Sequence, residues 1–286
     1  MSLSSAVLFG VFVLVAYGVQ DFLIAIVSRK IGVLRSSIWL LLTQLVFLVV
    51  LAPFLYVQIN VTSTIIIIAV LTGLLWVLGL ILFTKSLIEG NISVVVTITS
   101  AWGAVTAILA LILFKEVLST MQALDISMVV LGTVLLSFDL NSFLRGKKRT
   151  RAVGMSYALP TMLIYGAVFF LTSLMAKLAG WFDAAFFITI PAVFFMFVYG
   201  FAINDGINVN RVQIPALVLI GCLGLIGFFS YNLGTQYNYT SIVAPISAAS
   251  PLITVLLASV IVKEKLSGNQ FLGIALVIVG LALLAI

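Results

Sequence analysis

The amino-acid sequence predicts an all-α integral membrane protein with ten transmembrane helices arranged as two inverted five-helix repeats. Composition is the first reason, since 64% of the 286 residues are apolar, 8% are charged and the mean hydropathy is +1.36. The second reason is a series of apolar runs of about 20 residues, the length that crosses the hydrocarbon of a bilayer. The third is that the sequence repeats itself after 148 residues, as Tyr17 and Tyr165 illustrate.

The runs are separated by short polar stretches, which set the expected helix boundaries. They are residues 6–28, 36–56, 63–87, 92–114, 121–140, 153–178, 184–203, 214–237, 241–262 and 269–286. Stretches such as 64–73 and 275–286 are continuously apolar, whereas the strands of a membrane barrel alternate between lipid-facing and lumen-facing residues. Helices are therefore expected throughout, because they satisfy their own backbone polar groups in lipid. We expect the first run to be retained, since it lacks a basic leader and a small-residue cleavage pattern.

The two halves of the chain match at polar, tyrosine and glycine positions in one register. Tyr17, Gly18, Gly32, Gly73, Lys115, Glu116, Ser119, Gln122 and Gly132 fall on Tyr165, Gly166, Gly180, Gly221, Lys263, Glu264, Ser267, Gln270 and Gly280. A shared register of this kind indicates an internal duplication. We divide the chain into a first five-helix repeat at 1–140, a basic linker loop at 141–151 and a second five-helix repeat at 152–286.

Each predicted repeat holds an odd number of spans, so the second copy must enter the membrane from the opposite side. Inverted repeats are typical of secondary transporters, in which a site near the midplane opens to one side and then to the other. The duplication therefore predicts alternating access.

The sequence also resembles the EamA-type transporters of the drug/metabolite transporter superfamily. The resemblance rests on residues 262–270 (VKEKLSGNQ) with Gly280, on their first copy at 114–122 with Gly132, and on 246–254 (ISAASPLIT). It implies a plasma-membrane permease or exporter of small metabolites such as amino acids or drug-like compounds. It also implies a cavity lined by the first, third and fourth helices of each repeat.

Polar and aromatic residues on those helices are the candidates for substrate binding. They are Gln20, Asp21, Trp76, Phe83, Ser100, Trp102, Tyr165, Tyr231, Asn232, Gln236 and Ser250. A carboxylate two turns before Arg29 is costly in hydrocarbon, so Asp21 is a candidate for proton coupling or for holding a cationic group. The alternative is that Asp21 pairs with Lys85 or Arg29 and only joins helices. The aromatic residues equally fit packing or an interfacial belt.

Helix breaks and gating have their own candidates. Gly103 and Pro251 can free backbone groups in the fourth and ninth helices, although small residues also permit close helix contact. The pairs Lys115–Glu116 and Lys263–Glu264 end these two helices, and each glutamate can cap the helix that follows. We expect structural or gating roles for both pairs.

Several function classes are disfavoured by what the sequence lacks. It has no histidine and one cysteine, Cys222, so we expect no metal, no cofactor, no catalytic residue and no disulfide. It also has no Gly-Lys-Ser/Thr phosphate loop, which disfavours an ATPase. A secondary transporter is the leading interpretation. A non-transporting receptor or scaffold is the first alternative, and an intramembrane enzyme, which would need paired acids or a base beside a nucleophile, is the second.

Charge predicts orientation rather than a binding partner. The net charge of +6 includes the basic loop at 141–151, which we interpret as a topogenic loop and not as a nucleic-acid site. The distribution of Lys and Arg puts the N-terminus outside, whereas the family resemblance implies that both termini are inside. Asp183, Asp205 and Arg211 are expected to be loop charges. The expected partners are the bilayer, a small substrate and a coupling proton. A monomer suffices for an inverted pair, and a homodimer stays open.

Overall fold

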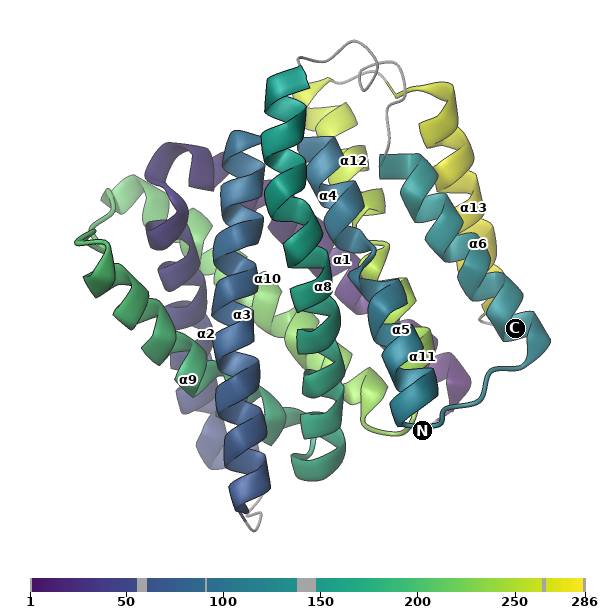
Figure 1. Ribbon diagram of the computed structural model, residues 1–286, viewed down its shortest axis with the longest axis horizontal. Helices are drawn as coiled ribbons and strands as arrows, with labels where there is room; N and C mark the ends of the chain where they lie inside the picture. The colour runs from purple at the N-terminus through teal and green to yellow at the C-terminus, as the bar shows by residue number, and fades with distance from the viewer. Residues whose placement is uncertain (1, 56–60, 91, 138–147, 264–265, 285–286) are drawn as a thin grey trace.

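The computed structural model describes residues 2–55, 61–90, 92–137, 148–263 and 266–284, and every regular element in these ranges is a helix (Figure 1). The α-helices are α1 (Leu3–Ile31), α2 (Val33–Leu55), α3 (Ser63–Glu89), α4 (Ile92–Ser100), α5 (Trp102–Leu113), α6 (Thr120–Ser137), α8 (Lys148–Ala179), α9 (Trp181–Ala202), α10 (Ile214–Thr235), α11 (Thr240–Ala248), α12 (Pro251–Leu257) and α13 (Gly268–Leu284). A 3-10 turn, η1 (Arg211–Gln213), precedes α10, and a π-helical turn, η2 (Ala258–Val262), follows α12.

Seven stretches of the described chain are long and apolar enough to cross a bilayer. They are Leu3–Ile31, Val33–Leu55, Ser63–Glu89, Ser156–Ala179, Trp181–Ala202, Arg211–Thr235 and Thr240–Ile261. The other three predicted spans correspond to shorter apolar helices at Ile98–Leu113, Thr120–Leu136 and Gly268–Leu284. The all-helical prediction is confirmed for the described residues, whereas a count of ten spans stays a prediction.

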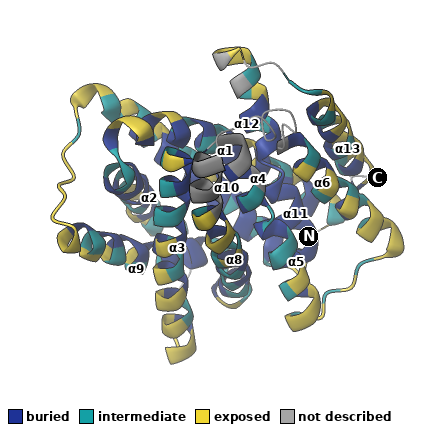
Figure 2. Cartoon of the chain, turned by 45° about the horizontal axis from the view of Figure 1, so that its top comes forward, coloured by how far each residue is buried: buried dark blue, intermediate teal, exposed yellow. Residues whose placement is uncertain are grey.

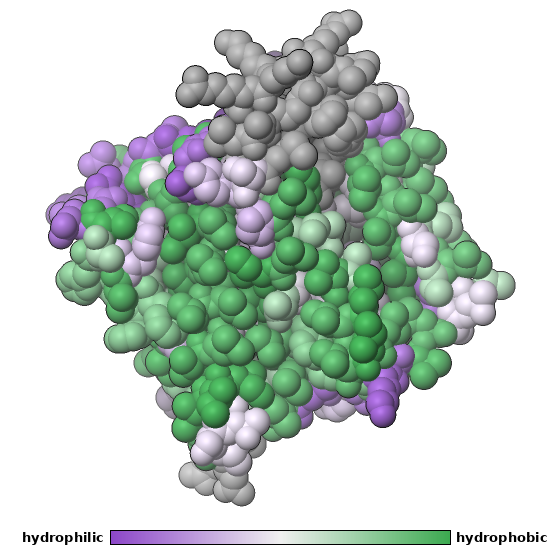
Figure 3. All heavy atoms as spheres, viewed as in Figure 1, coloured by the Kyte–Doolittle hydropathy of each residue, from purple (hydrophilic) through white to green (hydrophobic). Residues whose placement is uncertain are grey.

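The outer surface has the apolar character that lipid contact requires. In Figure 3 apolar residues cover most of the visible face, and hydrophilic residues gather at its edges. Large apolar side chains such as Phe54 and Phe194 are 82% and 61% exposed. Figure 2 shows the complementary pattern, with buried residues facing the interior of the bundle and exposed residues on its outer faces and connections. A surface of this kind would be unstable in water and is typical of a membrane protein.

Helix packing repeats itself with the two halves exchanged. Helix α1 packs along α10, and α3 packs along α8. A shift of 148 residues places α1 on α8 and α3 on α10. The contact of α8 with α3 therefore corresponds to the contact of α1 with α10, with the two halves of the chain exchanged. At the residue level, a Cβ on Gly227 would lie against the ring of Tyr17, and a Cβ on Gly79 would lie 2.6 Å from the ring of Tyr165. These four residues obey the same shift.

Backbone conformation follows the repeat as well. Gly32 and Gly180 have φ values of 88° and 89°, and Lys115 and Lys263 have φ values of 55° and 60°. Glycine adopts this left-handed region at little cost, whereas lysine does so at a cost that its surroundings must offset. The matching conformations make a chance similarity of the two halves less plausible.

The fourth and ninth predicted spans are each broken into two helices. Helices α4 and α5 are separated at Ala101, two residues before Gly103, where we expected the break. Gly103 instead lies in the first turn of α5, where an added Cβ would be 2.7 Å from the carbonyl oxygen of Ala244 in α11. It therefore permits close helix contact. Pro251 begins α12, a position that suits proline because the first helical N–H has no partner within the helix.

One expectation about charged residues is corrected, namely the placement of Asp183. Asp183 is not a loop charge, because it lies in the first turn of α9 and is 1% exposed. An acidic group is favoured in a first helical turn, where it faces the positive end of the helix dipole. Helix α8 begins at Lys148, inside the linker predicted at 141–151, whose bounds stay a prediction. The rest of that linker, 141–147, lies outside the described residues.

Candidate functional site

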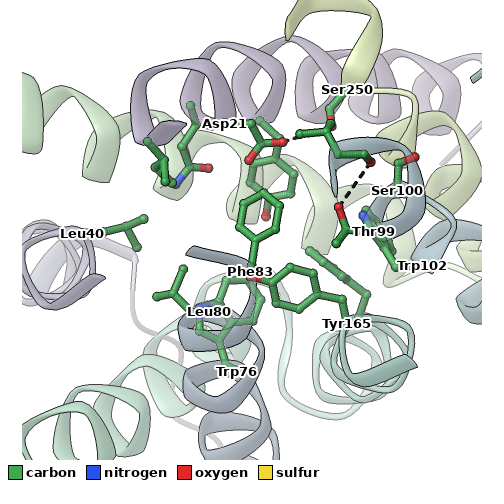
Figure 4. Close-up of a pocket in the computed structure, with 15 residues that line it drawn as sticks. Asp21, Leu40, Trp76, Leu80, Phe83, Thr99, Ser100, Trp102, Tyr165 and Ser250 are labelled. Carbon is green, nitrogen blue, oxygen red and sulfur yellow. Dashed lines mark hydrogen bonds between the residues drawn. The ribbon is translucent and has the colours of Figure 1, made fainter. Parts of the chain in front are cut away.

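A cavity of about 70 Å³ lies inside the bundle, between helices of both halves (Figure 4). Its walls come from α1, α2, α3, α4, α5 and α8, and from the connection between α11 and α12. The volume holds a few water molecules, and pockets for drug-sized ligands are several times larger, roughly 300–1000 Å³. In this conformation the cavity therefore fits only a small molecule.

Most of the residues that the sequence nominated for substrate binding line this cavity. They are Gln20, Asp21, Trp76, Phe83, Ser100, Trp102, Tyr165 and Ser250. Their role in binding stays a prediction, but the fold brings them together from five helices and one helix break. Seven further residues line the cavity that were not predicted from the sequence, namely Tyr17, Ile24, Leu40, Leu80, Val96, Thr99 and Phe169.

Three nominated residues on or just after α10 lie outside the cavity. Tyr231 is fully buried behind its wall, and the Tyr231 hydroxyl donates a hydrogen bond to the carbonyl oxygen of Phe169 at 3.1 Å. Asn232 is also buried, and its Nδ2 donates to the carbonyl oxygen of Trp181 at 2.9 Å. Gln236 follows the C-terminus of α10. In this conformation Tyr231 supports the cavity wall and Asn232 joins α10 to α9, and the role of all three residues in substrate binding stays a prediction.

Asp21 is half-buried on α1, and its carboxylate faces the cavity. Its Oδ2 accepts a hydrogen bond from the Ser250 hydroxyl at 3.4 Å, which links α1 to the break between α11 and α12. The alternative partners proposed for Asp21 are engaged elsewhere. Lys85 lies 4.0 Å from Glu89, and Arg29 donates to the carbonyl oxygen of Leu87 at 3.3 Å. No ion pair within the described chain involves Asp21.

Aromatic rings form the larger part of the wall opposite this carboxylate. Phe169 is at their centre, and it stacks on Trp102 with 3.9 Å between ring centroids. Trp76 meets the same ring edge-on at 5.6 Å, and Tyr17 and Tyr165 lie at 6.0 and 6.2 Å from it. The Tyr17 hydroxyl is buried and makes no hydrogen bond. A buried hydroxyl without a partner is costly.

A second polar cluster lies away from the cavity, where Glu116 connects three segments. Glu116 Oε1 accepts hydrogen bonds from Lys177 Nζ at 3.0 Å and from the Thr240 N–H at 3.1 Å. Its Oε2 accepts from the N–H and the hydroxyl of Ser241, both at 2.7 Å. The side chains of Glu116 and Lys177 are 3% and 15% exposed. Glu116 therefore caps α11 and not, as predicted, the helix that follows it.

The balance of forces on Glu116 favours its charged form. Burial opposes ionisation, but the two hydrogen bonds from Ser241 and the bond and positive charge of Lys177 outweigh burial and lower the pKa of the Glu116 carboxyl.

The following helix, α6, is capped by a different pair. The Ser119 N–H donates to Gln122 Oε1 at 2.9 Å, and the Gln122 N–H donates to the Ser119 hydroxyl at 3.2 Å.

The other charged gating candidates are Lys115, Lys263 and Glu264. Lys115 and Lys263 are exposed, and both occupy the left-handed region at the ends of their helices. Glu264, the repeat equivalent of Glu116, lies outside the described residues.

Comparison with known proteins adds the family. Residues 152–286 match the sequence model of the EamA-like transporter family. The match covers the second half of the chain. The seven long apolar helices indicate a multi-pass membrane protein, and the family that matches the second half is one of transporters.

Two further similarities concern length and fold. An uncharacterised protein of Methanocaldococcus jannaschii is 29% identical over 138 residues, which make up 48% of this chain and 99% of that protein. That relative is therefore about half as long as this chain. A solved structure described only as "Crystal structure of protein" is 17% identical, with a TM-score of 0.80 over 99% of this chain and 98% of its own. The two chains share a fold along their full length.

Proposed function

We propose that the protein is a secondary transporter that moves small metabolites, such as amino acids or drug-like compounds, across the plasma membrane by alternating access. The observation that carries the proposal is the cavity, because it combines one carboxylate with polar and aromatic groups inside an otherwise apolar bundle. Polar groups at such positions are expensive in a membrane and usually mark a substrate or ion pathway. Both halves of the chain supply lining residues, as expected for a site between repeats.

We further propose that the two halves are inverted five-helix repeats, bounded at 1–140 and 152–286, which give ten spans. The exchanged contacts of Gly79 with Tyr165 and of Gly227 with Tyr17 support this arrangement. The half-length relative supports it as well, since a single repeat would have that size. Two similar halves can exchange their conformations, and that exchange would open the cavity to the other side.

Asp21 is the proposed coupling residue. A carboxylate that faces a cavity can take up a proton while the cavity is open to one side and release it on the other. Ser250 lies in the break between α11 and α12, and its hydroxyl donates a hydrogen bond to Asp21. Protonation of Asp21 would therefore change a contact made by that break. The cluster of Glu116, Lys177 and Ser241 is the proposed gate, because it holds α8 against α11.

A non-transporting receptor or scaffold is the alternative. It would need neither a cavity shared by two halves nor an interior carboxylate without a basic partner. Reconstitution into liposomes separates the two functions. We expect the purified protein to exchange at least one member of a panel of labelled amino acids, sugars and amines, and an imposed pH gradient to drive its accumulation. Folded protein that exchanges nothing across the panel would favour the alternative.

A further inference from the structure

We propose that the Asp21 cavity selects organic cations, namely amines whose ammonium group pairs with Asp21 while their apolar part lies against the aromatic wall. This inference rests on the proposed transport function and specifies its substrate class. Within the range of substrates proposed above, it favours drug-like amines over amino acids, which are zwitterions, and over anions.

Charge is the first argument. Asp21 is the one charged side chain among the residues that line the cavity. An anion would meet this carboxylate without a basic partner, and a zwitterion would bring a second carboxylate into the same low-dielectric space. A buried charge that lacks a partner costs several kcal/mol, so both are disfavoured. An ammonium group instead supplies the partner that Asp21 lacks.

The basic residues closest in sequence to the cavity-lining segments do not change this balance. Lys85, which follows Phe83 on α3, lies 4.6 Å from the ring centre of Tyr157 and within 4.0 Å of Glu89. Arg29, two turns beyond Asp21 on α1, is bonded to the carbonyl oxygen of Leu87. Neither lines the cavity.

The aromatic wall is the second argument. Six of the lining residues carry aromatic rings, and their faces attract cations through the ring quadrupole. In Figure 4 Asp21 lies on one side of the cavity, and Trp76, Phe83 and Tyr165 lie on the opposite side. An ammonium group between them would contact a carboxylate and ring faces together. The attached carbon chain or ring would bury its apolar surface on Trp102 and Phe169, which stack on each other.

Hydrogen bonding gives a third indication. The Ser250 hydroxyl donates a hydrogen bond to Oδ2 of Asp21, which leaves Oδ1 of the carboxylate for a ligand. A carboxylate oxygen only accepts hydrogen bonds, which fits an ammonium group because that group only donates them.

The test uses three ligands that share a phenyl ring and differ in charge. They are phenethylamine, which is a cation, phenylalanine, which is a zwitterion, and 3-phenylpropionate, which is an anion. Binding of each radiolabelled ligand to the purified full-length protein is measured in detergent, without transport. We expect phenethylamine to bind at least about thirtyfold more tightly than either of the others, as the loss of one buried charge partner implies.

Two variants locate the binding. Asp21→Asn keeps the shape of the side chain and should weaken phenethylamine binding by about thirtyfold or more. Asp205→Asn removes an acid from an exposed ion pair with Arg35 and should leave binding unchanged. Both variants must elute as the wild-type protein does in size-exclusion chromatography.

The outcomes separate this inference from the transport proposal. Equal or tighter binding of phenylalanine or 3-phenylpropionate, or no phenethylamine binding by folded wild-type protein, would overturn the inference. Transport of such ligands in liposomes would then still support a transporter. Selective phenethylamine binding that Asp21→Asn abolishes would support the cation site, even if liposomes showed no exchange.

Discussion

At the level of single residues, the carboxylate of Asp21 is the proposed link between the substrate, the proton and the helix break. It faces the cavity, it accepts a hydrogen bond from Ser250 at 3.4 Å, and no basic residue of the described chain pairs with it. Ser250 directly precedes α12, so the carboxylate is tied to a point where the backbone is already interrupted.

Asp21→Asn should therefore abolish gradient-driven uptake and spare the exchange of one substrate molecule for another. The amide keeps the hydrogen bond with Ser250 but cannot gain or lose a proton. The measurement is accumulation and counterflow of a transported substrate in liposomes with an imposed pH gradient, with Asp205→Asn as the control. If this substrate is a cation that needs the charge of Asp21, counterflow should fall as well. Unchanged gradient-driven uptake by Asp21→Asn would remove this residue from the coupling mechanism.

The residues of the cavity were predictable only where their chemistry differs from that of the lipid-facing surface. Asp21, Gln20 and Trp102 are conspicuous in an apolar helix, whereas Ile24 and Leu40 are not, although they line the same cavity. In a membrane protein both the core and the outer face of a helix are apolar, so hydrophobic periodicity does not say which way a helix is turned. For the same reason the sequence did not predict that Asn232 would donate a hydrogen bond to the backbone of α9.

At the level of secondary-structure elements, Glu116 joins the connection after α5 to α8 and α11. Glu116→Gln should lower the free energy of unfolding by about 3–5 kcal/mol, because it leaves the charge of Lys177 without its partner. The exposed pair Arg35–Asp205 is the control, since its side chains are 36% and 40% exposed and its loss should cost no more than about 1 kcal/mol. Denaturation in mixed micelles measures the free energy of unfolding of each variant. Equal, small effects of Glu116→Gln and Asp205→Asn would contradict the role of Glu116.

The pH dependence of this stabilisation has a definite sign. The pKa of Glu116 is lowered in the folded protein, so its contribution is complete above the ordinary carboxyl pKa of about 4.3 and is lost as the pH falls through the lower folded value. Wild-type protein should thus lose more stability than Glu116→Gln between pH 6 and pH 3. Parallel pH profiles of the two proteins would show that Glu116 is not held in its charged form.

Helices α6 and α13 pack so closely at Gly132 that there is no room for a side chain at this position. An added Cβ on Gly132 would lie 2.8 Å from the backbone nitrogen of Val277 and 2.9 Å from the carbonyl oxygen of Gly273. Gly132→Ala should destabilise the protein by about 1–3 kcal/mol, since backbone cannot move aside as a side chain can. Gly268→Ala, at a position with open space around it, should have little effect. The measurement is the thermal unfolding midpoint of each variant. A Gly132→Ala protein that is as stable as Gly268→Ala would contradict this packing.

Most of the element boundaries could be read from the sequence, because apolar runs and polar punctuation follow directly from the thickness of the bilayer. The interruption of the helix at Ala101 could not be predicted from the sequence, because Ala101 does not differ in kind from its neighbours. The break becomes apparent only from the packing of α5 against α11. The capping of α11 by Glu116 was likewise invisible, because the two segments are more than one hundred residues apart and only tertiary contact joins them.

For the whole molecule, the 148-residue repeat is the feature that sequence and structure share most fully. The family match covers 152–286, and the proposed repeat extends to the first half through residue pairs such as Gly79 with Gly227 and Tyr17 with Tyr165, which exchange partners in the fold. The orientation of the protein in the membrane is set by the distribution of its basic residues rather than by helix packing.

Charge predicts that both termini lie outside. With ten spans the ends share one side, and in that orientation most of the Lys and Arg residues face the cytoplasm. A green fluorescent protein fused to the C-terminus should therefore stay dark, whereas a fusion after residue 145, in the basic linker, should fluoresce. Strong fluorescence of the C-terminal fusion would reverse the predicted orientation.

The central claim, that one cavity opens alternately to the two sides of the membrane, is tested most directly by the accessibility of a cysteine placed in it. Cys222 is the only cysteine of the chain, so Cys222→Ala gives a background without thiols. Ser100→Cys then places one thiol in the cavity, and Val49→Cys, at a position that is 54% exposed on the apolar surface, serves as the lipid-facing control. A membrane-impermeant methanethiosulfonate is added from one side or the other of sealed, oriented vesicles. Alternating access predicts that Ser100→Cys reacts from both sides and Val49→Cys from neither, whereas reaction of Ser100→Cys from one side only, or from none, would contradict it.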